Sequence, residues 1–198
     1  MTTTIKSRAE LTVGIMTGYA NSHVIEATGD NDGEQIDKFN ELSNVAKGSS
    51  YCVTSYNFAV TKAECYRQGI DPTPENMRKI FNEIVLKNII PGTASVTEFM
   101  TWAQKKGLWI ERDQWRTVLP GYGVAFDFTR PGGKLMRHWE CVVKCNPIFD
   151  STVGGNTMPE GASQIESNDP RHNGGVFERR RVRLNIPGFR TLGYFKLL

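Results

Sequence analysis

Apolar residues recur every three or four positions through the first half of the chain, which is the spacing of amphipathic helices. Gly and Pro interrupt the pattern where one helix is expected to stop and the next to begin. Thr73 and Pro74 have the residue types of an N-cap and a first helical position, and Ser95 with Glu98 matches a capping box. The helices predicted on this basis cover residues 8–27, 34–47, 52–68, 74–88 and 95–106.

The period changes to two in the second half, where alternating segments are separated by turn-forming residues. The strands predicted there cover residues 121–128, 136–144, 148–153, 175–184 and 191–198. Helices followed by antiparallel strands predict an α+β fold, with N-terminal helices packed on a C-terminal antiparallel β-sheet. We expect one domain over residues 1–198, with a helical half at 8–107 and a β half at 120–198.

The composition is that of an ordinary globular domain, since 39% of the 198 residues are hydrophobic and 23% are charged. A net charge of +3 favours an anionic polymer such as a bacterial wall or nucleic acid, without choosing between them. The chain has no arm in which Lys and Arg alternate with aromatic residues, so a nucleic-acid partner is not expected. The arginines at 179–181 are expected to be solvated strand residues.

The chain has no apolar run long enough for a membrane span, so no membrane-spanning segment is expected. Residues 1–10 are polar and contain no signal-peptide core. We therefore expect synthesis in the cytoplasm, and action elsewhere only after release or delivery.

A candidate nucleophile lies where the Gly/Ser loop at residues 48–50 runs into a predicted helix. Cys52 is the first residue of that helix. A helix N-terminus presents unpaired backbone N–H groups and about half a positive charge, which stabilise a thiolate. Because the thiolate is the reactive form of cysteine, this placement suits a nucleophile. The alternative is that Cys52 is a small buried apolar residue, as many free cysteines are.

A cysteine nucleophile needs a general base, and the chain offers only His23, His138 and His172. Alternation along the strand that His138 opens places Cys141 and Cys145 on the apolar face and His138 on the other face. We therefore expect His138 to be the base and the two cysteines to be core residues. A Cys-x3-Cys pair without a second pair is a poor zinc site, and we expect neither a metal nor another cofactor.

The base in turn needs a group that orients it. If the turn at Pro147 centres a hairpin, Asn156 faces His138 across the two strands. Glu140, two residues from His138 on the same face, is a weaker alternative as orienter or as a contact to substrate. Asn156 is equally well explained as a turn residue in the sequence Gly-Gly-Asn-Thr.

Three stretches of the chain carry short motifs that follow one another in a definite order. The first is an Asn-Asp-Gly loop followed, after a helix, by an aromatic residue and the cysteine. The second is a strand that begins with Pro-Gly and ends in Phe, followed by a strand that opens with the histidine. The third is a Gly-Asn-Thr stretch followed by Gly-Gly-Val and an arginine-rich strand. They lie at residues 27–33 with 50–52, 120–126 with 138, and 152–157 with 174–181. In this order they resemble the CHAP/NlpC-like branch of the papain-like cysteine peptidases, which cut bacterial peptidoglycan. The resemblance implies that the single domain over residues 1–198 is papain-like.

The chain departs from the pattern of this family at three sites. Tyr51 precedes the cysteine where tryptophan is usual, and it is a second candidate for an orienter or substrate contact. Trp139 and Glu140 follow the histidine where small or aliphatic residues are usual. Gly154 stands at the acidic position of the family's Glu-Gly-Asn stretch, so that Asn156 alone remains as the third member.

The resemblance implies a cysteine hydrolase that cleaves an amide bond of the peptidoglycan peptide, as an endopeptidase or as an N-acetylmuramoyl-L-alanine amidase. Cys52 would attack the carbonyl, His138 would transfer the proton, and Asn156 would orient His138. The implied partners are bacterial peptidoglycan and a delivery, release or immunity protein, with access through phage lysis, a virion or a secretion system. Two alternatives stay open. One is a catalytically weak or inactive papain-like structural or wall-binding phage module, and the other is a transferase or isopeptidase of the same fold that acts on a protein.

Overall fold

The computed structural model describes residues 6–28, 30–129, 133–157, 174–183 and 186–198, and His172 lies outside them. Among the described residues, the helices are α1 (Arg8–Asn21), α2 (Glu34–Leu42), α3 (Cys52–Arg67), α4 (Pro74–Leu86) and α5 (Val96–Lys105). A 3-10 helix, η1 (Arg112–Thr117), follows the first strand. The strands in this part of the chain are β1 (Trp109–Glu111), β2 (Gly123–Thr129), β3 (Leu135–Cys145), β4 (Phe149–Thr157), β5 (Gly175–Val182) and β6 (Phe189–Phe195).

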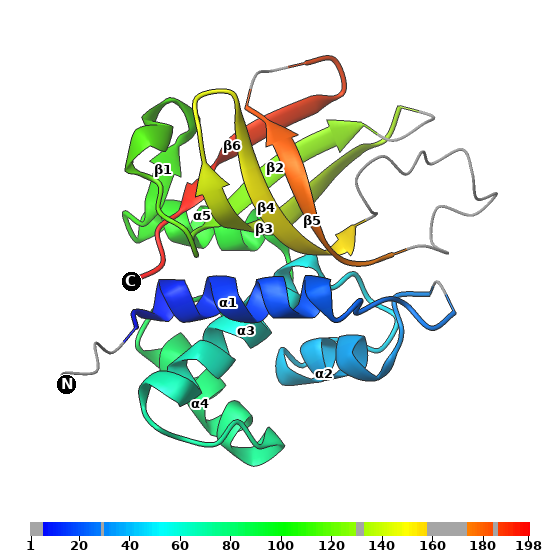
Figure 1. The fold of residues 1–198 in the computed structure, drawn as a ribbon, viewed down its shortest axis with the longest axis vertical. Helices are drawn as coiled ribbons and strands as arrows, with labels where there is room; N and C mark the ends of the chain where they lie inside the picture. The colour runs from blue at the N-terminus through cyan, green and yellow to red at the C-terminus, as the bar shows by residue number, and fades with distance from the viewer. Residues whose placement is uncertain (1–5, 29, 130–132, 158–173, 184–185) are drawn as a thin grey trace.

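The strands form one sheet in the order β1-β6-β2-β3-β4-β5, and all neighbouring pairs are antiparallel. Helices α1 to α4 gather along one side of the sheet, and α5 lies behind the strands in the view of Figure 1. This arrangement confirms the predicted α+β class. The β3–β4 hairpin has the predicted register where Cys141 faces Val153, and shifts by one residue nearer the turn, where Cys145 faces Asp150.

Two of the predicted helices end earlier than the apolar pattern suggests. Ser22 caps α1, and His23 then adopts a left-handed φ of 53°, which ends the helix. Beyond it Ile25 pairs with Gly175, so the segment expected to be the last helical turn runs beside β5 instead. Asn44, with a φ of 54°, follows the end of α2. Side-chain periodicity does not register these backbone reversals, which explains the overestimated lengths.

The predicted starts of α4 and α5 are confirmed by their caps. The Thr73 hydroxyl accepts a hydrogen bond from Asn76 N at 3.3 Å, and the Ser95 hydroxyl accepts one from Glu98 N at 3.3 Å. The capping box of α5 is incomplete, because the Glu98 carboxylate and the Ser95 backbone N–H are each hydrogen-bonded to Thr93 instead of to one another. The Thr93 hydroxyl donates to the Glu98 carboxylate and accepts from Ser95 N.

Helix α3 is the central element, because most of its residues are buried. The Tyr56 ring lies edge-on to Trp139 of β3 and to Phe195 of β6, and its hydroxyl donates to the Gly121 carbonyl oxygen at 2.8 Å. Phe99 of α5 packs 4.2 Å from the Trp139 ring, centroid to centroid. Buried aromatic side chains of this kind each contribute about 1.5–3 kcal/mol to folding. One apolar cluster therefore includes residues of both halves and holds α3 against the sheet.

Strand β1 and helix η1 are not predicted by the sequence. β1 spans 3 residues, which is too short for alternation to appear. It is recognisable from its packing partner, because the Trp109 ring covers Gly193 of β6. A Cβ added at Gly193 would lie 2.5 Å from Cζ2 of Trp109. The small residue on β6 thus makes room for the ring on β1.

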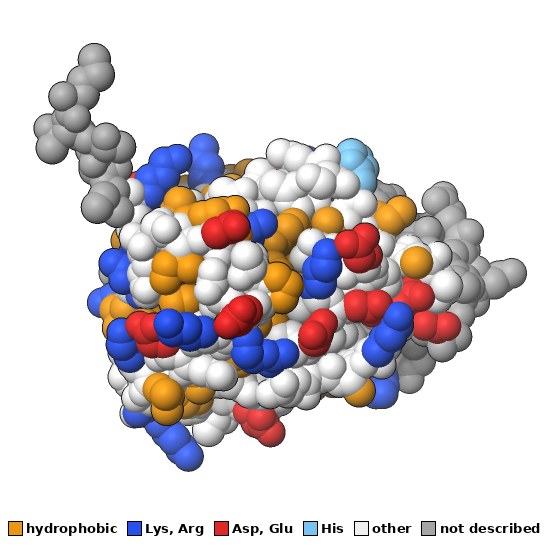
Figure 2. Space-filling view, turned by 90° about the horizontal axis from the view of Figure 1, so that it is seen from below, with side chains coloured by type: hydrophobic (Ala, Val, Ile, Leu, Met, Phe, Trp, Pro, Cys, Tyr) orange, Lys and Arg blue, Asp and Glu red, His pale blue; other side chains and the backbone are white. Residues whose placement is uncertain are grey.

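The outer surface of the helical layer carries both signs of charge. Acidic and basic side chains are interspersed over this face (Figure 2). Pairs such as Lys38 with Glu34 and Lys87 with Glu83 join successive helical turns. Of the helices that the structure describes, none has both the length and the apolar character needed to cross a bilayer. The mixed charges give this face no single-sign field.

Candidate active site

Cys52 occupies the first position of α3 and is 5% exposed. The loop before it is tied to α2 by Asn40, whose amide donates to the Ser49 carbonyl oxygen at 3.1 Å. The oxygen of the same side-chain amide accepts a hydrogen bond from the Thr54 hydroxyl, in the first turn of α3, at 2.8 Å. The Cys52 backbone N–H belongs to this first turn, which has no intrahelical acceptor. The helix start that the sequence predicts for Cys52 is therefore observed.

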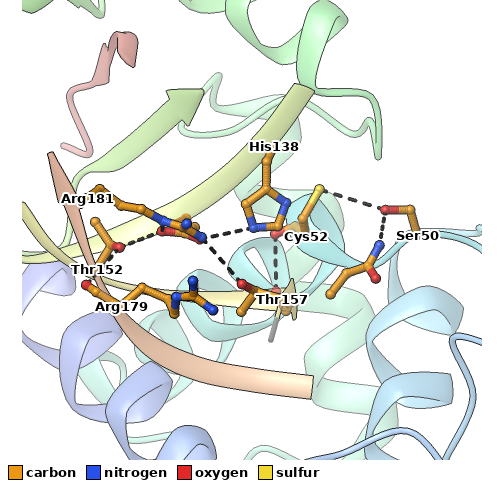
Figure 3. A network of polar contacts seen from close by, with 10 residues as sticks. Ser50, Cys52, His138, Thr152, Thr157, Arg179 and Arg181 are labelled. Atoms are coloured by element: carbon orange, nitrogen blue, oxygen red, sulfur yellow. Dashed lines mark hydrogen bonds and ion pairs between the residues drawn. The ribbon is translucent and has the colours of Figure 1, made fainter. Parts of the chain in front are cut away.

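His138 lies on β3 beside this helix start and is 7% exposed. Its imidazole is hydrogen-bonded to the Cys52 side chain. Figure 3 shows the ring between the Cys52 sulfur and the polar network around Arg181. Nε2 of the ring is 3.1 Å from Oε1 of Glu140. This contact is an ion pair when both ring nitrogens carry a proton.

Glu140 is fully buried and is held by two side chains in addition to its contact with His138. The Thr152 hydroxyl of β4 donates to its Oε2 at 2.5 Å. Arg181 of β5 donates through Nε to the same oxygen at 3.0 Å, and its Nη2 pairs with Oε1. Gly154 leaves space for the carboxylate arm, because a Cβ there would lie 2.4 Å from Cγ of Glu140. The carboxylate is therefore fixed in the position from which it faces His138.

The charges of the site follow from these contacts. Burial alone would lower the pKa of His138, but the contacts with Cys52 and Glu140 outweigh burial and raise it to about 9. Burial raises the pKa of the Cys52 thiol, but the hydrogen bond and positive charge of His138 bring it below its ordinary value. Despite burial, Arg181 and His138 hold the pKa of Glu140 well below its usual range. The contacts thus favour the ion pair of thiolate and imidazolium over the neutral pair of thiol and imidazole.

Asn156 lies near Cys52 but not where the sequence predicts it. Its Nδ2 donates to the Ser50 hydroxyl at 2.6 Å rather than to His138. The reason is a bulge in β4 between Gly154 and Thr157, within which Asn156 has a φ of 58°. The predicted face-to-face pairing ends before this bulge. The carboxylate of Glu140, the weaker sequence candidate, takes the place beside His138 instead.

Tyr51, the residue before Cys52, points into the protein and is fully buried. Its hydroxyl donates to Oε1 of Glu26 at 3.1 Å and accepts the backbone N–H of Asn156. Burial, more than the neighbouring Glu26, raises the pKa of the phenol far above its ordinary value. Tyr51 therefore braces the strand end that carries Asn156, and as a buried side chain it is poorly placed to contact substrate.

Sequence reasoning misses three residues of the site: Ser50, Thr152 and Arg181. The expectation that Arg181 is solvated is wrong, because its side chain is 16% exposed and binds Glu140. The available signal was Glu140 itself, since a carboxylate in an otherwise apolar strand must find a partner if it is buried. Which arginine supplies the partner depends on the β4–β5 pairing, which the sequence does not specify.

The other cysteines differ from Cys52. Of the two cysteines predicted to be core residues, Cys141 is fully buried and Cys145 is only half-buried. Burial raises the pKa of the Cys141 thiol well above the ordinary value. Burial also raises the pKa of Cys65, to about 11. All four are free thiols. Among the described residues, no group of three His, Cys, Asp or Glu side chains is arranged to hold a metal ion.

Comparison of the chain with protein-family models, with curated proteins and with solved structures found no match in any of the three.

Proposed function

We propose that this protein is a papain-like cysteine hydrolase that cleaves an amide bond, with Cys52 as nucleophile and His138 as acid and base. The observation that carries the proposal is the line of contacts from Cys52 through His138 to Glu140. It joins a thiol at a helix N-terminus to an imidazole, and the imidazole to a fixed carboxylate. A nucleophile, a base and an orienting group in sequence are the recurring parts of covalent acyl transfer.

The first half-reaction forms a thioester. The Cys52 sulfur attacks the amide carbonyl carbon, and the carbonyl electron pair moves onto the oxygen. The backbone N–H of Cys52, free in the first turn of α3, is positioned to stabilise that oxyanion. The imidazolium of His138 then gives its proton to the amide nitrogen as the C–N bond breaks. The amine leaves, and the acyl group stays on sulfur.

The second half-reaction releases the acid. Neutral His138 takes a proton from water as the water oxygen attacks the thioester carbonyl. Collapse of the tetrahedral intermediate breaks the C–S bond and returns the Cys52 thiolate opposite the imidazolium. Glu140 stays ionised throughout and favours the charged ring by its proximity.

The substrate class in this proposal is the peptide of bacterial peptidoglycan. Its support is the order of short motifs from the Asn-Asp-Gly loop to the arginine-rich strand, together with the net charge of +3. A positive chain is attracted to an anionic wall at low ionic strength. The bond cleaved would be one within the stem peptide or the lactyl–alanine amide.

The test is loss of turbidity in a suspension of purified bacterial walls. The unmodified protein is expected to clear the suspension, and Cys52→Ala is expected to abolish clearing while keeping its circular dichroism spectrum. Cys145→Ala, which removes the other cysteine that is not fully buried, is the matched control and is expected to clear walls normally. Full activity of Cys52→Ala would contradict the proposal.

Mass spectrometry of the soluble digest distinguishes the open alternatives. New amino termini within the stem peptide would identify an endopeptidase. Free carboxyl groups on the lactyl moiety would identify an amidase. Intact walls combined with rapid stoichiometric labelling of Cys52 by iodoacetamide at neutral pH would point to a transferase or isopeptidase on a protein. Intact walls with an inert thiol would point to a structural or wall-binding module.

A further inference from the structure

Ser50 lies between Asn156 and Cys52 at the edge of the candidate site. Its hydroxyl oxygen accepts the Asn156 amide at 2.6 Å and lies 4.0 Å from the Cys52 sulfur (Figure 3). Because the amide nitrogen can only donate, the hydroxyl proton remains free to point elsewhere. The sulfur is the acceptor in that direction. Ser50 is exposed, so this contact is made at the surface of the site.

Asn156 is held in an uncommon conformation that directs two donors at the start of α3. Its φ of 58° falls in the left-handed region, which asparagine tolerates better than most residues. Its side-chain amide reaches Ser50, and its backbone N–H reaches the Tyr51 hydroxyl. The Tyr51 hydroxyl is anchored in turn by Glu26. A strained residue braced from several sides at a candidate site is a sign of a functional constraint.

We propose that Ser50 is a positioning residue for the Cys52 thiolate, and that Asn156 acts on Cys52 through Ser50 rather than on His138. This inference rests on the proposed function. The Ser50 hydroxyl donates to the thiolate, and the Asn156 amide holds the hydroxyl oxygen so that its proton faces the sulfur. The chain of donors thus runs from the β4 bulge to the nucleophile, on the side of Cys52 away from Glu140.

Two further groups act directly on the sulfur besides the Ser50 hydroxyl. His138 faces it from β3, and the Trp139 backbone N–H donates to it from the same strand. Glu140 and Arg181 act on the sulfur through His138. Removing the Ser50 hydroxyl leaves all of these contacts in place. A change in the ionisation of Cys52 in a Ser50 variant would therefore report the hydroxyl itself.

The test measures the ionisation of Cys52 without any substrate. The rate of Cys52 alkylation by iodoacetamide is followed against pH, with the modified residue identified by mass spectrometry. Ser50→Ala and Asn156→Gly are each expected to raise the apparent pKa of the thiol by about 1 pH unit. At a pH below the pKa, this rise lowers the thiolate fraction roughly tenfold. Glycine at 156 keeps the left-handed backbone and the N–H to Tyr51. Ser49→Ala, one residue away, is the matched control and should leave the profile unchanged.

The double variant Ser50→Ala with Asn156→Gly decides whether the two residues act in series. A shift equal to that of Ser50→Ala alone supports the proposal, because Asn156 then has no route to the sulfur except Ser50. Additive shifts would overturn it, as would a normal profile in Ser50→Ala. Ser50→Thr keeps the hydroxyl and should restore most of the wild-type profile.

Asn156→Asp provides a second variant that keeps the size of the side chain. Its carboxylate accepts the Ser50 proton and turns it away from sulfur, so the thiol pKa should rise more than in Asn156→Gly. An equal or smaller rise would contradict the proposed direction of donation. These measurements stay informative if wall digestion fails, since the thiol profile does not depend on which substrate is cleaved.

Discussion

At the scale of single residues, the charge of His138 depends on Glu140. Burial would keep the imidazole neutral, yet its pKa is raised to about 9 by the thiol on one side and the carboxylate on the other. Glu140 can supply this field because Arg181 and Thr152 keep its charge and orientation fixed. The imidazolium in turn favours the Cys52 thiolate. The nucleophile is thus tuned by a carboxylate that acts on it through the imidazole.

Glu140→Gln should preserve the shape of this arrangement and remove its charge. The pKa of His138 is then expected to fall toward its ordinary value, because the imidazolium loses its anionic neighbour. Since the active form needs a charged ring, the alkaline limb of the pH–activity profile should move to lower pH. Peak activity should fall by about 100-fold or more. The profile is measured by wall clearing, and alkylation of Cys52 reports the accompanying change in the ionisation of the thiol.

Glu178→Gln is the control for this change. Glu178 lies on β5 like Arg181, but it is exposed and accepts from the Ser151 hydroxyl at 2.6 Å. Its neutralisation should leave the alkaline limb where it is. An unchanged limb in Glu140→Gln as well would mean that Glu140 does not set the charge of His138.

At the scale of elements, the site exists because β4 approaches the first turn of α3 closely. Two glycines make this approach possible. A Cβ at Gly154 would collide with Glu140, and a Cβ at Gly155 would lie 2.6 Å from the Ser55 hydroxyl and 2.7 Å from the Tyr51 ring. The bulge that follows them turns Asn156 toward Ser50. The backbone of β4 therefore lies close to α3 at the helix start that carries Cys52.

Gly155→Ala should force β4 away from α3. We expect a loss of about 1–3 kcal/mol in the free energy of unfolding, because the added methyl overpacks a tight contact. Cys52 alkylation should slow as well, since Asn156 moves with the strand. The free energy of unfolding is measured by urea denaturation, and the reactivity is measured by the rate of Cys52 alkylation. Gly14→Ala is the matched control, since nothing lies within 4 Å of its added Cβ on an exposed side of α1.

Gly14→Ala should raise the free energy of unfolding by about 0.5–1 kcal/mol, because alanine replaces glycine inside a helix. A Gly155→Ala protein as stable and as reactive as the unmodified chain would show that the approach of β4 is less tight than these distances indicate.

At the scale of the whole molecule, the candidate site joins the helical half to the β half. Cys52 and Ser50 come from the first half, and His138, Glu140 and Asn156 come from the second. The same halves share one apolar cluster around α3. Catalytic geometry and core packing therefore depend on the same contacts. Loss of the core contacts would separate the nucleophile from its base.

Unfolding should consequently be a single transition. All four tryptophans lie at or beyond Trp102, whereas most helical residues precede it, so two optical probes report different halves. Tryptophan fluorescence and far-ultraviolet circular dichroism are expected to give superimposable urea curves. Curves with separate midpoints would show that the halves unfold independently and would contradict the prediction of one domain.

The residues that the sequence identifies correctly are those governed by local rules. Thr73 and Ser95 begin helices because their hydroxyls satisfy nearby backbone N–H groups. Cys141 is buried because alternation assigns it to the apolar face. The hairpin register near Cys141 is the one predicted from a turn centred on Pro147, although the pairing shifts by one residue nearer the turn. Each depends on neighbours within a few positions or on one turn, so the chain itself carries the information.

The sequence by itself determined the order of helices α1 to α5 and of strands β2 to β6, the cysteine at a helix start and the histidine on a strand. Only the tertiary structure decided that Glu140 faces His138 while Asn156 turns to Ser50, and that Arg181 is paired rather than solvated. The physical reason is that these contacts depend on a strand bulge and on pairing between distant strands. Periodicity assigns a residue to a face, but packing of the whole chain decides what that face meets.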